Sequence, residues 1–77
     1  ALAPDYSFTV DIVDEVGSIS TLSVILASKG ISIKNIGINH NREHGEGALR
    51  ISFYDKDAME AAWAQLTKYH YELIKNS

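Results

Sequence analysis

Apolar and polar residues alternate along two stretches of the chain, residues 6–12 and residues 48–53. The apolar positions are Tyr6, Phe8, Val10 and Ile12 in the first stretch, and Leu49, Ile51 and Phe53 in the second. A period of two is expected of a strand that buries one face, and aromatic and β-branched residues favour strands. Both stretches are therefore predicted to be strands with one face in the core.

A third strand-like stretch, residues 31–41, changes parity along its length. Ile31 and Ile33 share one parity, whereas Ile36 and Ile38 have the other. Because a slip of one residue turns every later side chain to the opposite face, either this strand carries a bulge near Lys34 and Asn35, or its two faces are covered along different parts of its length. We expect the strand to be packed from two sides. Asn35 lies at the break, where its amide can bind a ligand or satisfy the bulged backbone.

Two further segments have the apolar spacing of amphipathic helices. The apolar positions are Ile19, Leu22, Ile25 and Leu26 in the first, and Met59, Ala62, Trp63 and Leu66 in the second. Ser18 and Asp55 are the predicted N-caps, because their side-chain oxygens can accept hydrogen bonds from the first turn. Gly30 is predicted to end the first helix, since glycine readily adopts a positive φ. A short last strand is predicted over residues 69–74.

The order of these elements is β-α-β-β-α-β, which predicts an α+β fold of the ferredoxin-like type. Its four-stranded antiparallel sheet would carry both helices on one face. The expected strand order is four-one-three-two, counted along the chain, and it places Ile31–Asn41 on an edge. A long edge rich in isoleucine and free of proline invites pairing. We therefore expect a homodimer in which this strand pairs with its own copy.

The chain has 77 residues, enough for one small domain with a marginal core. Residues 1–5, which hold the only proline, are interpreted as a linker or a remnant of cloning, and residues 6–77 as the domain. No apolar run approaches the ~20 residues of a membrane span, and no signal-peptide pattern is present. The absence of cysteine fits a reducing compartment. We expect a cytoplasmic location without membrane association.

The sequence contains no convincing catalytic or metal-binding constellation. The histidines are His40, His44 and His70, and the first two are four residues apart on a predicted strand and turn rather than on one helical face. We expect no catalytic residue and no metal site. A formal net charge of -3, seven scattered basic residues and a poor match of residues 47–54 to the RNA-recognition signature argue against nucleic-acid binding.

The turn Asp14–Ser18 is the better candidate for a binding site. Gly17 would let a ligand approach the backbone, and the turn leads into a helix N-terminus, where N–H groups attract an anion such as a carboxylate. An ordinary strand-to-helix turn would have the same features, so both interpretations stay open.

The sequence D-E-V-G-S-I at residues 14–19, followed by a helix, Gly30 and the strand I-S-I-K-N-I at residues 31–36, resembles the ACT domain, a small regulatory module that binds amino acids. The resemblance covers Tyr6 to about Ile74. The family pattern in the turn is commonly D-x-P-G-x-L, and here Val16 replaces the proline and Ile19 the leucine. More narrowly, residues 31–50 are similar to the C-terminal ACT domains of prephenate dehydrogenases from Gram-positive bacteria.

This resemblance implies a regulatory part of an NAD-dependent enzyme of tyrosine biosynthesis, with no cofactor and no catalysis in the domain itself. In related ACT domains an effector amino acid lies between two copies. Carried over, Gly17 and Ser18 would donate backbone N–H groups to its carboxylate, and Asp14 would assist with its ammonium. Asn35 and Ile36 of the other copy would contact its amino group and side chain. L-tyrosine is the preferred effector and L-phenylalanine the second; a structural dimerisation module without a ligand is the alternative.

Overall fold

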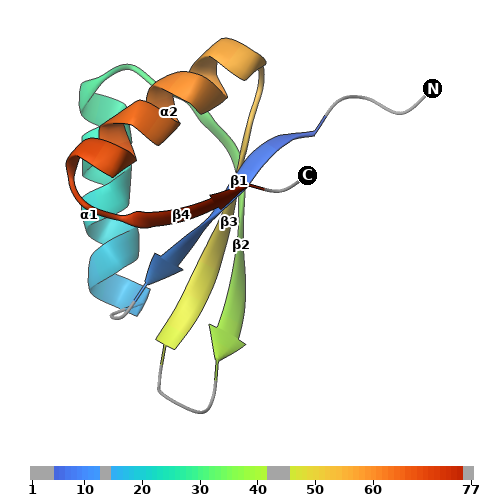
Figure 1. Ribbon diagram of the computed structural model, residues 1–77. Coiled ribbons are helices and arrows are strands. Elements are labelled where there is room, and N and C mark those ends of the chain that lie inside the picture. The colour runs from blue at the N-terminus through green and yellow to red at the C-terminus, as the bar shows by residue number, and fades with distance from the viewer. Residues whose placement is uncertain (1–4, 13–14, 42–45, 76–77) are drawn as a thin grey trace.

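The computed structural model describes residues 5–12, 15–41 and 46–75 (Figure 1). The elements are β1 (Tyr6–Ile12), α1 (Glu15–Ser28), β2 (Ile33–Asn41), β3 (Glu46–Phe53), α2 (Lys56–Lys68) and β4 (Glu72–Lys75). The predicted β-α-β-β-α-β order is therefore confirmed. Two predicted boundaries shift: β2 begins two residues later than expected, and the last strand covers residues 72–75 rather than 69–74.

All neighbouring strands of the sheet are antiparallel, in the order β2-β3-β1-β4. This is the predicted order, with β2 on one edge and β4 on the other. Both helices lie on the same side of the sheet, as Figure 1 shows. Helix α2 contacts β1, β3 and β4, and it also packs against α1.

The core lies between the helices and one face of the two central strands. Phe8 pairs with Ile51 and Val10 with Leu49 across β1 and β3, so their side chains share a face. The buried apolar residues are Phe8, Val10, Ile12, Leu22, Leu26, Leu49, Ile51, Phe53, Ala62 and Leu66. The alternation predicted for both central strands, and the apolar stripes predicted for both helices, are thus confirmed.

A bulge in β2 explains the change of parity among its isoleucines. Ile33 pairs with Phe53, but the next pairing is Asn35 with Ser52, so Lys34 is the extra residue. After the bulge, Ile36 pairs with Ile51, which is buried under the helices. All the isoleucines of β2 therefore face the helices, and the expectation that this strand is packed from two sides was wrong. The bulge alone accounts for the pattern.

The two helices begin differently from one another. Asp55 caps α2 as predicted, because its Oδ1 accepts a hydrogen bond of 2.8 Å from the N–H of Ala58. Helix α1 begins at Glu15, so Gly17 and Ser18 lie within its first turns. The prediction that Ser18 is the N-cap was therefore wrong. The residue before Glu15 is Asp14, another residue type with high N-cap preference, and it lies outside the described residues.

The two helices end in the same motif, although only one of them uses glycine. In α1 the N–H of Ile31 donates to the carbonyl of Leu26 and that of Gly30 to Ala27, with φ of 70° at Gly30. In α2 the N–H of Tyr71 donates to Leu66 and that of His70 to Thr67, with φ of 68° at His70. Both ends are Schellman motifs that start from a buried leucine.

Burial raises the pKa of the Tyr71 phenol above its usual value.

The left-handed backbone at His70 yields a stability prediction. A residue with a Cβ is strained at this φ, whereas glycine is not, so His70→Gly should raise the free energy of unfolding by about 1 kcal/mol. Gly30→Ala should lower it by about 1 kcal/mol at the matching position of α1. Urea denaturation of the two variants beside the wild type measures both changes. A loss of stability in His70→Gly would contradict this account of the helix end.

Candidate functional site

The residues predicted to bind a ligand lie in two separate places. Gly17, Ser18 and Ile19 are in the first turns of α1, where each is partly exposed, and Ile19 also packs against the core. Val16 is in the same turn. Gly17 and Ser18 thus belong to the helix rather than to a loop before it. The start of α1 is the positive end of the helix dipole, which favours an anionic group.

Asn35 and Ile36 form the second place, next to the bulge of β2. The Asn35 side chain is exposed, and its Oδ1 accepts a hydrogen bond of 3.0 Å from the N–H of Ile36. Ile36 is partly buried and packs against the core. The two side chains therefore point to opposite faces of the sheet. One of the two roles expected for Asn35, satisfying the bulged backbone, is confirmed by this hydrogen bond. Because the Asn35 side chain is exposed, the other role, binding a ligand, stays open.

A single chain holds these two places far apart. Helix α1 follows Ile12, which pairs with Gly47, and Gly47 pairs with His40 at the far end of β2. Asn35 pairs with Ser52 near the other end of the same strand. The five residues from Asn35 to His40 correspond to about 17 Å along a strand. The predicted site is therefore not assembled within one copy of the domain.

Helix α1 and strand β2 expose several uncharged residues. No residue from Val16 to Ser28 in α1 carries a charge. Val24 of this helix is 68% exposed, and Ile38 of β2 is 40% exposed. An uncharged helix face and an unpaired strand edge are each typical of a surface that another protein covers.

The part of the chain that the structure describes contains no group of three or more histidine or acidic side chains that could hold a metal ion. His44 lies outside the described residues, and His40 and His70 are on β2 and at the end of α2. Neither of the described helices is long and apolar enough to cross a membrane.

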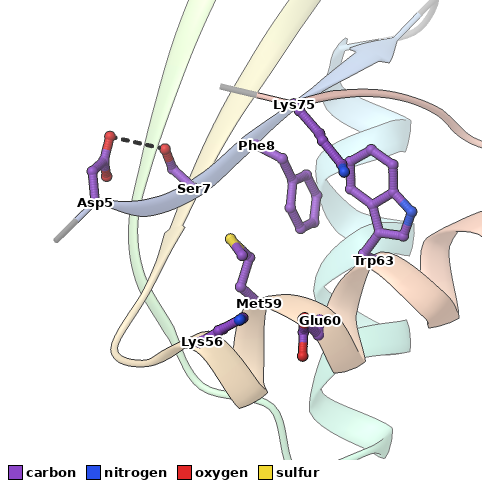
Figure 2. A pocket seen from close by; sticks show the side chains of 8 residues that line it. All are labelled: Asp5, Ser7, Phe8, Lys56, Met59, Glu60, Trp63 and Lys75. Atoms are coloured by element: carbon purple, nitrogen blue, oxygen red, sulfur yellow. Dashed lines mark hydrogen bonds between the residues drawn. The ribbon is translucent and has the colours of Figure 1, made fainter. Parts of the chain in front are cut away.

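The structure also has a pocket that sequence reasoning missed, lined by β1, α2 and β4 (Figure 2). Its volume is about 600 Å³, and Met59 and Trp63 of the predicted apolar stripe line it beside Phe8. The spacing of the stripe predicts helix packing but cannot show where a packed surface stays open to solvent. The pocket is formed by three segments that are far apart in the sequence.

The chain combines this strand order with two helices on one face. It also has a glycine in the first turn of α1 and an asparagine at the β2 bulge, in agreement with the resemblance of its sequence to the ACT domain. The ACT domain of the prephenate dehydrogenase TyrA from Bacillus anthracis has a similar solved structure, with a TM-score of 0.83 and 36% identity over 87% of this chain and 97% of that chain. Prephenate dehydrogenase from Bacillus subtilis strain 168 is 44% identical over 62 residues. The chain belongs to the family of prephenate dehydrogenase ACT domains.

The matched residues are 80% of this chain but only 17% of the Bacillus subtilis enzyme. A formyltetrahydrofolate deformylase from Pseudomonas putida KT2440 has a TM-score of 0.55 and 17% identity, over 91% of this chain and 28% of that one. This second likeness shows the fold alone. No family model matches the chain.

Proposed function

We propose that this domain binds an aromatic amino acid between two of its copies and thereby inhibits a prephenate dehydrogenase of which it is a part. The parent enzyme would use NAD, while the domain itself would hold no cofactor and catalyse no reaction. L-tyrosine is the preferred effector and L-phenylalanine the second. The observation that carries the proposal is the separation of Asn35 from the start of α1 along an unpaired edge strand.

Pairing of β2 with its own copy would remove this separation. In an antiparallel pair with a two-fold axis at Ile38, Asn35 of one copy lies opposite Asn41 of the other. Asn41 follows His40, and both His40 and Ile12 pair with Gly47. Because α1 follows Ile12 in the chain, this end of β2 is near the start of α1. Each two-fold pair would then contain two complete sites. The exposed side chains of Ile38 would meet at the axis.

Each complete site would consist of two half-sites, the start of α1 from one copy and Asn35 with Ile36 from the other. The residues of the two half-sites have complementary chemistry toward an amino acid. The start of α1, with Gly17 and Ser18, would bind the carboxylate through the helix dipole and the backbone. Asn35 of the other copy would accept from the ammonium, because its Oδ1 has a second lone pair beside the one that holds the Ile36 N–H. Asp14 would assist with the ammonium. Val16, Ile19 and Ile36 would line the space for the side chain.

Inhibition would follow from the position of the effector between two copies. A ligand that needs both half-sites binds only the paired arrangement, so it stabilises that arrangement by its differential affinity. Coupling free energies of this kind are typically about 1–3 kcal/mol. In the parent enzyme, the stabilised pair would hold the attached catalytic domains in a less active arrangement.

A second function, dimerisation without a ligand, is favoured by one observation. The Oδ1 of Asn35 already satisfies the backbone at the bulge, which accounts for an asparagine at this position without an effector. In that case the start of α1 would be an ordinary helix N-terminus. The two functions differ in one measurable property, the binding of an aromatic amino acid.

Calorimetric titration of the chain with L-tyrosine and L-phenylalanine should give saturable binding, with one site per chain. Asn35→Ala removes the acceptor for the ammonium, and Gly17→Val places a branched side chain in the first turn of α1. Each should weaken binding about tenfold or more. Asn35→Asp keeps an acceptor oxygen and serves as the matched control that retains binding. No heat of binding in either the chain or the parent enzyme would favour dimerisation without a ligand.

Pairing through β2 can be tested directly because the chain contains no cysteine. Ile38→Cys should form a disulfide-linked dimer under mild oxidation, since two thiols would meet at the two-fold axis. Ile74→Cys, at an exposed position on the opposite edge strand β4, is the control that should stay monomeric in denaturing gels. Ile38→Lys should dissociate the dimer in sedimentation experiments, because two charges would be brought together. Cross-linking at position 74 but not at 38 would place the interface on β4.

A further inference from the structure

The pocket between β1, α2 and β4 lies at the opposite end of β1 from α1. Ser7 and Phe8 line it near the start of β1, whereas α1 follows Ile12 at the other end. These ends are about 17 Å apart along the strand. The pocket is also on the side of the sheet away from the edge strand β2. It is therefore separate from the start of α1. It is two strands away from Asn35, which pairs with Ser52 opposite Ser7.

Aromatic and sulfur-containing side chains form the inner surface of the pocket. Phe8 is buried, and the indole of Trp63 meets its ring edge to face, with ring centroids 5.3 Å apart and planes at 90°. Met59 and Trp63 are only partly buried, although both pack against the core (Figure 2). Aromatic edges and faces and a thioether favour contact with another ring.

Charged side chains at the rim are available to a ligand. Lys56, Glu60 and Lys75 are exposed, and within the described part of the chain none of their side chains forms an ion pair or a hydrogen bond. Lys75 of β4 and Lys56 of α2 both line the pocket, together with Trp63 and Met59 (Figure 2). Two ammonium groups against one carboxylate leave an excess of positive charge.

Asp5, the remaining acidic group at the rim, is already paired. Its Oδ2 accepts a hydrogen bond of 3.0 Å from the Ser7 hydroxyl and forms an ion pair with Arg50. Ser7 is a buried polar residue of β1 and also lies within 3.4 Å of the Arg50 guanidinium. This network occupies the carboxylate of Asp5, so it does not compete for Lys56 or Lys75.

We propose that this pocket binds a small carboxylate that carries an aromatic ring. The ring contacts Met59 and Trp63 beside the buried Phe8, and the carboxylate pairs with the ammonium of Lys75, with Lys56 as the second cation at the rim. A volume of about 600 Å³ lies within the range of small-molecule sites, which are largely apolar with a few polar groups that fix the orientation. An ammonium on the ligand is not required. The proposal is independent of the effector site between two copies.

The fluorescence of Trp63, the chain's only tryptophan, reports directly on the occupancy of this pocket. We expect phenylpropanoate, which has the ring and the carboxylate but no ammonium, to change the emission saturably. Phenylpropanol, which has the same ring but an alcohol in place of the carboxylate, should give no saturable change at equal concentration. The wild-type chain is used for both titrations.

Substitutions of the rim lysines test whether they bind the carboxylate of phenylpropanoate. Lys75→Gln should weaken phenylpropanoate binding roughly fivefold, and the Lys56→Gln, Lys75→Gln double variant should weaken it further. Lys34→Gln, an exposed lysine on β2, is the matched control that should leave the titration unchanged. Asn35→Ala should also leave it unchanged, which separates this pocket from the effector site.

Three results would overturn the proposal. The first is the lack of a saturable emission change with phenylpropanoate at millimolar concentration. The second is an equal affinity for phenylpropanol, which would show a purely apolar contact. The third is a titration that is unaffected in the double lysine variant or is lost in Asn35→Ala. The failure of the effector site in calorimetry would not produce any of these results.

Discussion

One extra residue in β2 determines which of its side chains reach the core. Lys34 has no partner in β3, so the strand resumes its pairing with Asn35 opposite Ser52 and Ile36 opposite the buried Ile51. Without the bulge, Ile36 and Ile38 would turn to the open face and Asn35 would lie under the helices, where an amide without partners is costly. The bulge therefore places apolar groups inside and the candidate ligand-binding amide outside, with one backbone adjustment.

The same strand lies on the edge of the sheet, and this position connects the fold to the proposed function. An edge strand leaves a row of backbone groups without ladder partners, and its own copy is a suitable partner because the pairing satisfies both strands at once. Helix α1 also carries no charged residue from Val16 to Ser28. The bulge, the edge and the start of α1 thus supply three parts of one proposed interface.

Much of the fold could be predicted from local patterns in the sequence. Period-two alternation located β1 and β3. Asp55 marked the start of α2 because its side chain can cap a helix, and Gly30 marked the end of α1 because glycine readily adopts a positive φ. The N-cap of α1 was mispredicted because Ser18 is a good capping residue by type, whereas the helix begins three residues earlier, at Glu15. His70 was not predicted at a helix end, since its left-handed backbone belongs to a motif in which the N–H of Tyr71 donates to the carbonyl of Leu66.

The candidate site was only partly predictable for a related reason. Asn35 and the turn before α1 were identified one by one, but their separation within a chain depends on strand register, which no local pattern contains. The pocket against Trp63 depends on three segments and on which of their packed surfaces stay open. Sequence spacing identifies the residues of a site, while the register and the edges of the sheet decide how many copies of the chain are needed to complete it.

The central claim is that the effector binds where two copies meet, so ligand binding and pairing must be linked. Sedimentation equilibrium of the chain, with and without saturating L-tyrosine, measures the dissociation constant of the pair in both conditions. The account predicts that L-tyrosine lowers this constant about fivefold or more, since a ligand strengthens the arrangement that it binds preferentially. An unchanged dissociation constant, or L-tyrosine bound to a species that sediments as a single chain, would contradict it.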